Sequence, residues 1–191
     1  LAVGVPDASP ASVTYTNPGY ASQWDRVPGA PRGTRGGLSV IHHFPADGEY
    51  NLELWFEHTT TGEFYGGVTP GEQLEISIDG ERVALLEVDR WMHTSDPNGA
   101  SQEIDPIFVR AGPHRVSAAF LQIADGPIED LLSPHDWSLV DRKIGTGGYG
   151  VTALAHLKDL AIVGPFTPTG VSETPSREAL FTCRPTSSAS E

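Results

Sequence analysis

The sequence predicts an all-β fold, an antiparallel β-sandwich with long loop inserts, because three segments share a pattern of a turn and an alternating strand. The first runs from Phe44 to Phe56, the second from Leu74 to Val83, and the third from Val109 to Phe120. Each combines turn-forming Gly, Pro or Asp residues with a run in which apolar and polar side chains alternate. Repeated short strands joined by turns are typical of a sandwich of two sheets.

Length and composition favour a single globular domain. The chain has 191 residues, of which 38% are hydrophobic, and its 21 Gly and 16 Pro suit many turns between strands. We expect the sandwich to span residues 13–166. Residues 1–12 read as a leader or linker, and residues 167–191 as a linker-like C-terminal tail rich in Thr, Ser and Pro.

The charge balance excludes some classes of partner. Twenty-five acidic and 12 basic residues give a net charge of −13, which repels phosphate backbones and anionic lipids. Nucleic acid is therefore not an expected partner, and no run of about 18 apolar residues predicts insertion into a membrane. Neutral ligands and divalent cations remain compatible with this charge, and an ordinary solvated acidic surface is the alternative explanation.

Further strands are expected outside the three repeated units. A short edge strand is predicted at 13–15, and the alternation over 38–44 predicts a strand that pairs as a hairpin with 50–57. A last strand is predicted over 157–163, where Gly164-Pro165 should stop the pairing.

The strand after Gly48 carries the first candidate for a ligand site. By the period of two in a strand, one face holds Tyr50, Leu52, Leu54 and Phe56, and the other holds Asn51, Glu53, Trp55 and Glu57. An indole among carboxylates suits sugar binding, because the C–H faces of a pyranose stack on the ring while carboxylates accept hydrogen bonds from hydroxyls. The alternative is that the long inserts cover this face and bury Trp55.

Long polar connections at 58–72, 91–106 and 125–156 supply further aromatic residues. Such loops are frequently functional, and loops of a β-sandwich gather at its two ends. Aromatic side chains could clamp a saccharide there or simply anchor the loops to the sandwich. The candidate ligand-binding residues are therefore Trp55, Glu53, Glu57, Tyr65, Trp24, Trp91 and Trp137.

An acidic turn between two predicted strands is a candidate calcium site. The oxygen donors are the hard ligands that calcium prefers, although their spacing is not that of an EF-hand. Asp-Pro and Asn-Gly are also ordinary turn formers, which is the alternative. The candidate ligands are Asp96, Asn98, Glu103 and Asp105. No haem is expected in this segment, because Cys183 is the single cysteine and no Cys-x-x-Cys-His is present.

Four motifs carry a resemblance to a known family: Gly33–Gly37, Phe44–Tyr50, Leu74–Val83 and Phe181–Pro185. Together they resemble the central region of planctomycete-type multidomain proteins that carry the DUF1592 group of domains. The order of turns and strands is also similar to that of jelly-roll carbohydrate-binding modules. The first resemblance implies that the chain is part of a longer exported protein whose haem lies in a separate cytochrome c-like domain. It also implies a partner for Cys183 beyond Glu191.

The leading hypothesis is therefore a non-catalytic carbohydrate-binding module of an exported protein, located in the periplasm, at the cell surface or outside the cell. Its expected partners are a polysaccharide or oligosaccharide and the neighbouring domains of the parent protein. An interdomain scaffold that binds no glycan is the first alternative. A carbohydrate-active enzyme on the same fold is the second, and it would need two carboxylates, or a His and a carboxylate, converging in a cleft. An exposed Trp55 and Tyr65 would favour a ligand site, and their burial would favour a scaffold.

Overall fold

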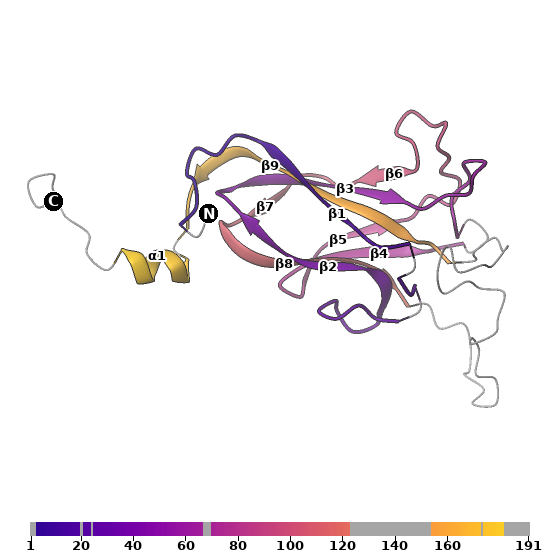
Figure 1. Cartoon of the computed structure of the whole chain (residues 1–191), viewed down its shortest axis with the longest axis horizontal. Helices are drawn as coiled ribbons and strands as arrows, with labels where there is room; N and C mark the ends of the chain where they lie inside the picture. Colours follow the sequence, from indigo (N-terminus) through magenta and orange to yellow (C-terminus); the bar gives the residue numbers. More distant parts are fainter. Residues whose placement is uncertain are drawn as a thin grey trace, which may run out of the picture.

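The chain folds as a sandwich of two antiparallel β-sheets, which confirms the predicted fold class (Figure 1). The five-stranded sheet has the order β1-β9-β3-β6, with β7 also pairing with β3, and the four-stranded sheet has the order β2-β8-β4-β5. The computed structural model describes residues 3–19, 21–23, 25–66, 70–122, 154–172 and 174–181.

The chain passes from one sheet to the other several times, since β1, β3, β6, β7 and β9 belong to the first sheet and the remaining strands to the second. Within the described ranges, no helix has the length and apolar character needed to cross a bilayer. The elements are β1 (Ala11–Thr16), β2 (Thr34–Phe44), β3 (Asp47–Phe56), β4 (Gln73–Ile78), β5 (Glu81–Glu87), β6 (Ser101–Glu103), β7 (Ile107–Val109), β8 (Gly112–Leu121), β9 (Leu157–Gly170) and α1 (Pro175–Leu180).

The core lies between the sheets and is built from alternate residues of each strand. On β3 the inward side chains are at most 1% exposed and the outward ones are half-buried or exposed, so the predicted alternation is confirmed. Each fully buried large apolar side chain contributes about 1.5–3 kcal/mol to folding. The largest fully buried side chains are Tyr50, Phe44, Phe56, Phe120, Leu52, Leu54, Leu74, Ile76, Leu157, Leu160, Ile162 and His156.

The predicted hairpin between 38–44 and 50–57 is wrong, because β2 and β3 lie in different sheets. β2 pairs with β8, whereas β3 pairs with β6, β7 and β9. Only Pro45 and Ala46 separate the two strands, and Pro45 has no N–H with which to continue a ladder. Phe44 and Tyr50 enter the core from opposite sheets, and their rings meet edge to face at 4.7 Å. A period of two is equally compatible with a hairpin and with this crossing.

The Asp79-Gly80 hairpin is confirmed. β4 and β5 pair in antiparallel register, and both turn residues have positive φ, 52° for Asp79 and 86° for Gly80. This is the backbone of the primed turns that match the twist of two-residue hairpins.

β9 continues past Gly164-Pro165, contrary to the expectation that pairing stops there. Gly164 still pairs with Ala11, and Phe166 pairs with Glu49, at the cost of register shifts along β3. The strand therefore reaches Gly170, inside the segment that we expected to be a linker-like tail.

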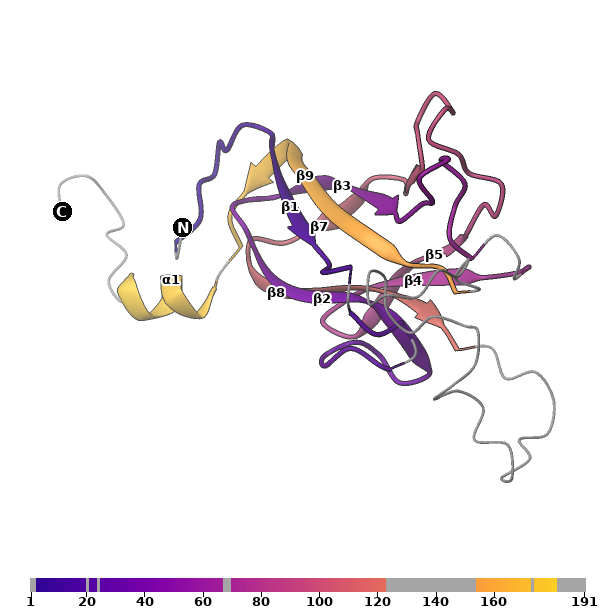
Figure 2. The same cartoon turned by 45° about the vertical axis from the view of Figure 1, so that its right-hand side comes forward.

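The two ends of the described chain meet at one end of the sandwich (Figures 1 and 2). Thr174 caps α1 by accepting a hydrogen bond from the backbone N–H of Arg177. The guanidinium of Arg177 donates to the carbonyl oxygen of Val3 at 2.7 Å, and the N–H of Val5 donates to the carbonyl oxygen of Pro45 at 2.7 Å. The N-terminal segment, expected to be a linker, thus contacts the connection between β2 and β3, and α1 in turn contacts that segment.

Candidate functional site

The outer face of the five-stranded sheet presents Trp55 at the centre of a row of polar side chains. Trp55 is half-buried on β3. Directly opposite it lie Ser101 on β6 and Asp159 on β9, and Thr16 on β1 lies opposite Asp159. Opposed residues on neighbouring strands share a face with their Cβ atoms about 4.5–5.5 Å apart. The indole is therefore flanked by a hydroxyl on one side and a carboxylate on the other.

The next row on the same face adds two more carboxylates. Glu53 on β3 lies opposite Glu103 on β6, and on its other side it lies opposite Ala161 on β9, with Thr14 beyond. Glu103 was predicted as a calcium ligand, but the register places it beside Glu53 on this sheet face. Like charges directly opposite each other in a sheet are destabilising. The face therefore gathers acidic groups from three segments distant in sequence.

No basic side chain of the described residues forms an ion pair with these carboxylates. The described ion pairs are Arg35–Glu72, Arg82–Glu75 and His114–Asp79. Asp159 accepts a hydrogen bond from the hydroxyl of Thr16 at 2.6 Å. Lys158 is the one basic residue within the strands of this sheet. Glu53 and Glu103 thus present acceptor oxygens that other described side chains do not use.

A second aromatic position lies farther along the same face. Phe108 on β7 is 59% exposed and lies opposite Glu49 of β3, whose other neighbour is Phe166 on β9. Glu49 and Trp55 are six residues apart on β3, which corresponds to about 20 Å in a strand. We did not predict Phe108 as a site residue. The sequence does contain a signal for Phe108. The apolar residues on either side of it, Ile107 and Val109, pack against the core, so the period of two in a strand directs Phe108 outward.

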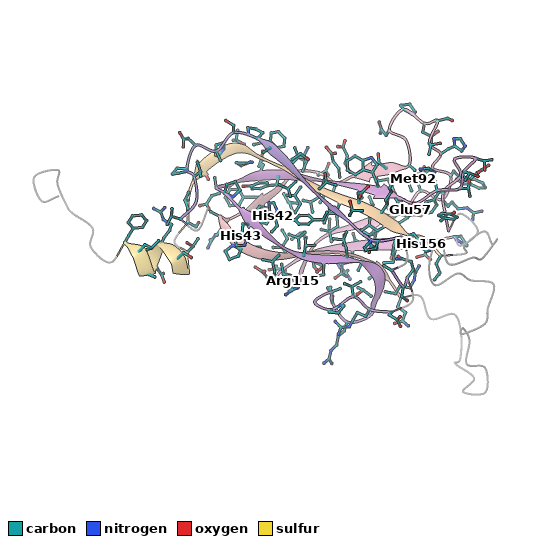
Figure 3. The ribbon with its side chains drawn as sticks, viewed as in Figure 1. His42, His43, Glu57, Met92, Arg115 and His156 are labelled. Carbon is teal, nitrogen blue, oxygen red and sulfur yellow. The ribbon has the colours of Figure 1, made fainter. Side chains whose placement is uncertain are left out.

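The end of β3 away from α1 is closed by the first long insert. Residues 58–66 of this insert fold back on themselves, with the N–H of Thr59 donating to the carbonyl oxygen of Glu63. Phe64 is buried and packs edge to face on Phe56 at 5.6 Å. Glu57, a predicted ligand residue, is half-buried here, and its N–H donates to the carbonyl oxygen of His156 (Figure 3). This part of the insert is therefore anchored in the core.

The predicted loop aromatics are not brought together by any described contact. Tyr65 is half-buried and its ring lies 5.8 Å from that of His156. Trp91 is 76% exposed, and the guanidinium of Arg90 stacks over it at 4.5 Å. The remaining predicted residues Trp24 and Trp137 lie outside the described residues, as does Cys183.

The predicted calcium ligands belong to two different environments. The carboxylate of Asp96 accepts a hydrogen bond from the N–H of His93 at 2.8 Å, so it closes its own turn. Asn98 and Asp105 are exposed. Among the residues that the structure describes, no group of three or more His, Cys, Asp or Glu is arranged to hold a metal ion. Calcium binding stays a prediction.

A buried polar cluster lies at the start of β2 and β4. Arg35 donates to Glu72 at 2.5 Å and to the carbonyl oxygen of Gln23. Burial raises the pKa of Glu72 more than Arg35 lowers it. Burial, followed by the charge of Arg35, lowers the pKa of His156 to about 4. Glu72 and His156 are both buried. An enzyme that used a His and a carboxylate would need both side chains to face an open cleft.

Comparisons with known proteins found similarity in structure alone. No protein-family model matches the chain, and no curated protein sequence matches it. The resemblance to the DUF1592 group therefore stays a prediction. A family 35 carbohydrate binding module from an environmental isolate is 12% identical, with a TM-score of 0.38, over 84% of this chain and 99% of the module.

Two further structures show the same level of similarity. A family 35 carbohydrate binding module from Clostridium thermocellum is 12% identical, with a TM-score of 0.34, over 81% of this chain and 98% of the module. Dimeric latent PorU from Porphyromonas gingivalis is 10% identical, with a TM-score of 0.36, over 84% of this chain and 13% of PorU. Similarity this low says nothing about ligands.

Proposed function

We propose that the chain is a non-catalytic carbohydrate-binding module of an exported multidomain protein, and that it binds glycan on the outer face of its five-stranded sheet. The observation that carries this proposal is Trp55 flanked by Ser101 and Asp159, next to the opposed carboxylates of Glu53 and Glu103. These groups come from β3, β6 and β9, and no described ion pair neutralises them.

The chemistry of this face suits a sugar ring. The indole of Trp55 offers a flat apolar surface for the C–H face of a pyranose, while ionised carboxylates act as acceptors for its hydroxyls. The rows that contain Trp55 and Phe108 are roughly 20 Å apart, from the rise per residue of a strand. This separation favours an extended glycan chain over a single sugar. With a net charge of −13, a neutral glycan is a better ligand than a polyuronate.

An interdomain scaffold is the second candidate, and α1 supplies the observation that favours it. Leu180 and Phe181 are exposed at the end of this helix, where a neighbouring domain of the parent protein could cover them. Such packing is compatible with glycan binding on the sheet face.

The test is binding of the chain to a panel of neutral and acidic polysaccharides, with calcium and with chelator. Replacing Trp55 by Ala should cost about 1–3 kcal/mol, the usual loss for an anchoring aromatic, which is roughly a 5- to 150-fold weaker affinity. Trp91→Ala is the matched control in a loop and should leave affinity unchanged. The reverse pattern would move the site to the loops, and no binding to any glycan would favour the scaffold.

A further inference from the structure

A separate cavity, open to solvent beside Val5 and Val13, lies at the edge between the two sheets, away from the outer face that contains Trp55. Its volume is about 280 Å³, and it lies where the edge strands β1 and β2 face each other. Val13 of β1, His42 of β2, Tyr50 of β3 and Ile162 of β9 line it, together with Val5 from the N-terminal segment. Among the described residues that line it there is no Asp, Glu, Lys or Arg.

The wall contributed by the N-terminal segment is held in place by hydrogen bonds. The N–H of Val5 donates to the carbonyl oxygen of Pro45, and Arg177 of α1 donates to the carbonyl oxygen of Val3, both at 2.7 Å. Figure 3 shows His42 in the half of the sandwich nearer α1. The cavity is thus preformed, which reduces the ordering cost of binding.

Two rings that line this cavity, those of His42 and Tyr50, belong to a longer series of aromatic contacts. Tyr15, His42, Phe44 and Tyr50 follow one another edge to face, with ring centroids 5.9, 4.5 and 4.7 Å apart. Edge-to-face pairs contribute beyond their buried area because the positive ring edge meets the negative face. His42 and Tyr50 both line the cavity, so an aromatic guest would extend this series of rings.

Two polar side chains in the wall, those of His42 and Tyr50, are already hydrogen-bonded. His42 Nδ1 is hydrogen-bonded to the Tyr15 hydroxyl at 2.9 Å, and the Tyr50 hydroxyl donates to the carbonyl oxygen of Ala46 at 2.8 Å. Burial, with a smaller contribution from His43, lowers the pKa of His42 to about 4, so its ring is uncharged at neutral pH. The described lining offers a cationic ligand no carboxylate, and it offers an anionic ligand no Lys or Arg, with His43 as the remaining titratable side chain, so a charged ligand would lose hydration for little return.

Volume sets the size of the guest. An apolar cavity of roughly 150 Å³ holds benzene, and pockets for drug-sized ligands begin near 300 Å³. We propose that this cavity binds one small neutral aromatic molecule of one or two rings, of the size of phenol or indole. The site is independent of the glycan face, since it lies between the sheets and shares none of the residues proposed to contact sugar.

Titration of the intact chain with indole and with phenol tests the proposal. The expected result is saturable shifts of the Val13 and Ile162 methyl signals in NMR spectra, together with a higher Tm. Cyclohexanol, which is similar in size to phenol but not aromatic, should bind several-fold more weakly. Absence of saturable shifts with both aromatic probes would overturn the proposal.

Blocking the cavity supplies the second part of the test. Val13→Trp places a large side chain in the cavity from an edge strand and should abolish indole binding. Val83→Trp is the matched control, because Val83 is 39% exposed on the other sheet and Val13 is 42% exposed. If the first variant fails to fold, Ala11→Phe fills the cavity from another position on β1. Indole affinity that persists in a folded blocked variant would refute the site, whatever the glycan panel shows.

Discussion

The two sheets of the sandwich treat their charged residues in opposite ways. In the four-stranded sheet and its turns, Arg35 pairs with Glu72 and Arg82 pairs with Glu75, each at 2.5 Å. On the outer face of the five-stranded sheet, Glu53 lies opposite Glu103, and neither forms a described ion pair. The four-stranded sheet therefore uses these charges to stabilise its own structure, whereas the opposed carboxylates of Glu53 and Glu103 have no partner among the described residues, and their repulsion has an energetic cost.

The outer faces also differ in how the described segments cover them. The connection before β2 lies against the four-stranded sheet, where a Cβ on Gly29 would come within 2.5 Å of Arg115 Nη1 and 3.0 Å of Ser39 Oγ. Ser77 and Ser117 are buried on that face. Opposed carboxylates on the other sheet do not help folding, and the proposed glycan site would account for their presence beside Trp55. The predictions below test this difference.

The largest effect is expected from breaking the most buried ion pair of the four-stranded sheet and its turns, Arg35–Glu72. The side chains of Arg35 and Glu72 are 6% and 4% exposed. Arg35→Met leaves the Glu72 carboxyl buried without its partner and should lower the free energy of unfolding by about 3–5 kcal/mol. Urea denaturation measures the loss. The double variant with Glu72→Met should recover much of it, and a single-variant loss below about 1 kcal/mol would contradict the assignment.

Asp47 belongs to the five-stranded sheet, but its carboxylate, like those of Glu72 and Glu75 in the other sheet and its turns, interacts with groups of the fold itself. Partial burial alone would raise the pKa of Asp47. The hydrogen bonds from Ala111 and Ser172 lower this pKa by more than burial raises it, so the net shift is downward. Because the folded pKa lies below the unfolded value of about 3.9, its contribution is present above that pH and is lost as the pH falls through the folded pKa. Asp47→Ala should cost about 2 kcal/mol at neutral pH.

The measurement for Asp47 is urea denaturation at about pH 7 and again near pH 3, below the ordinary Asp pKa. The difference between the wild type and Asp47→Ala should shrink at the lower pH. Ser172→Ala, which removes one of the two bonds from that residue, should show the same trend at smaller amplitude. A difference that is independent of pH would mean that the carboxylate charge plays no part.

A smaller effect is expected at the more exposed pair of the four-stranded sheet. The side chain of Arg82 is 51% exposed, although that of Glu75 is 7% exposed. Solvent screens this pair, so Arg82→Met should cost about 1 kcal/mol or less. The loss should fall further in about 1 M salt, where the Debye length is about 3 Å. A cost equal to that of Arg35→Met would show that burial does not separate the two pairs.

Local patterns predicted those features that depend on neighbours in sequence. The alternation around Leu54 and the Asp79-Gly80 turn follow from strand period and turn backbone. The partner of β2 was predicted wrongly, because a period of two in 38–44 and 50–57 fits a hairpin and a crossing between sheets equally well.

The site shows the same limit. Sequence reasoning placed Glu53 and Trp55 on one face of β3, which the structure confirms, but it assigned Glu103 to a calcium turn and did not consider Asp159. These two residues join Trp55 only through the pairing of β3 with β6 and β9. The register of strands distant in sequence is a tertiary property, and the sequence of any one segment does not contain it.

The smallest effect on stability is expected at Glu53, on the outer face of the five-stranded sheet, where one substitution should change stability and glycan affinity in opposite directions. Glu53→Gln removes the repulsion between Glu53 and Glu103 and should stabilise the unliganded chain by about 0.2–1 kcal/mol. The same change replaces an anionic acceptor by a neutral amide, so glycan affinity should fall. Glu81→Gln, at an exposed position of β5 on the other sheet, is the matched control and should leave affinity unchanged. Residues that improve stability when replaced but weaken binding are those retained for a ligand. If Glu53→Gln instead weakened both, the carboxylate would be part of the folding interactions, and the contrast between the two sheets would lose its functional meaning.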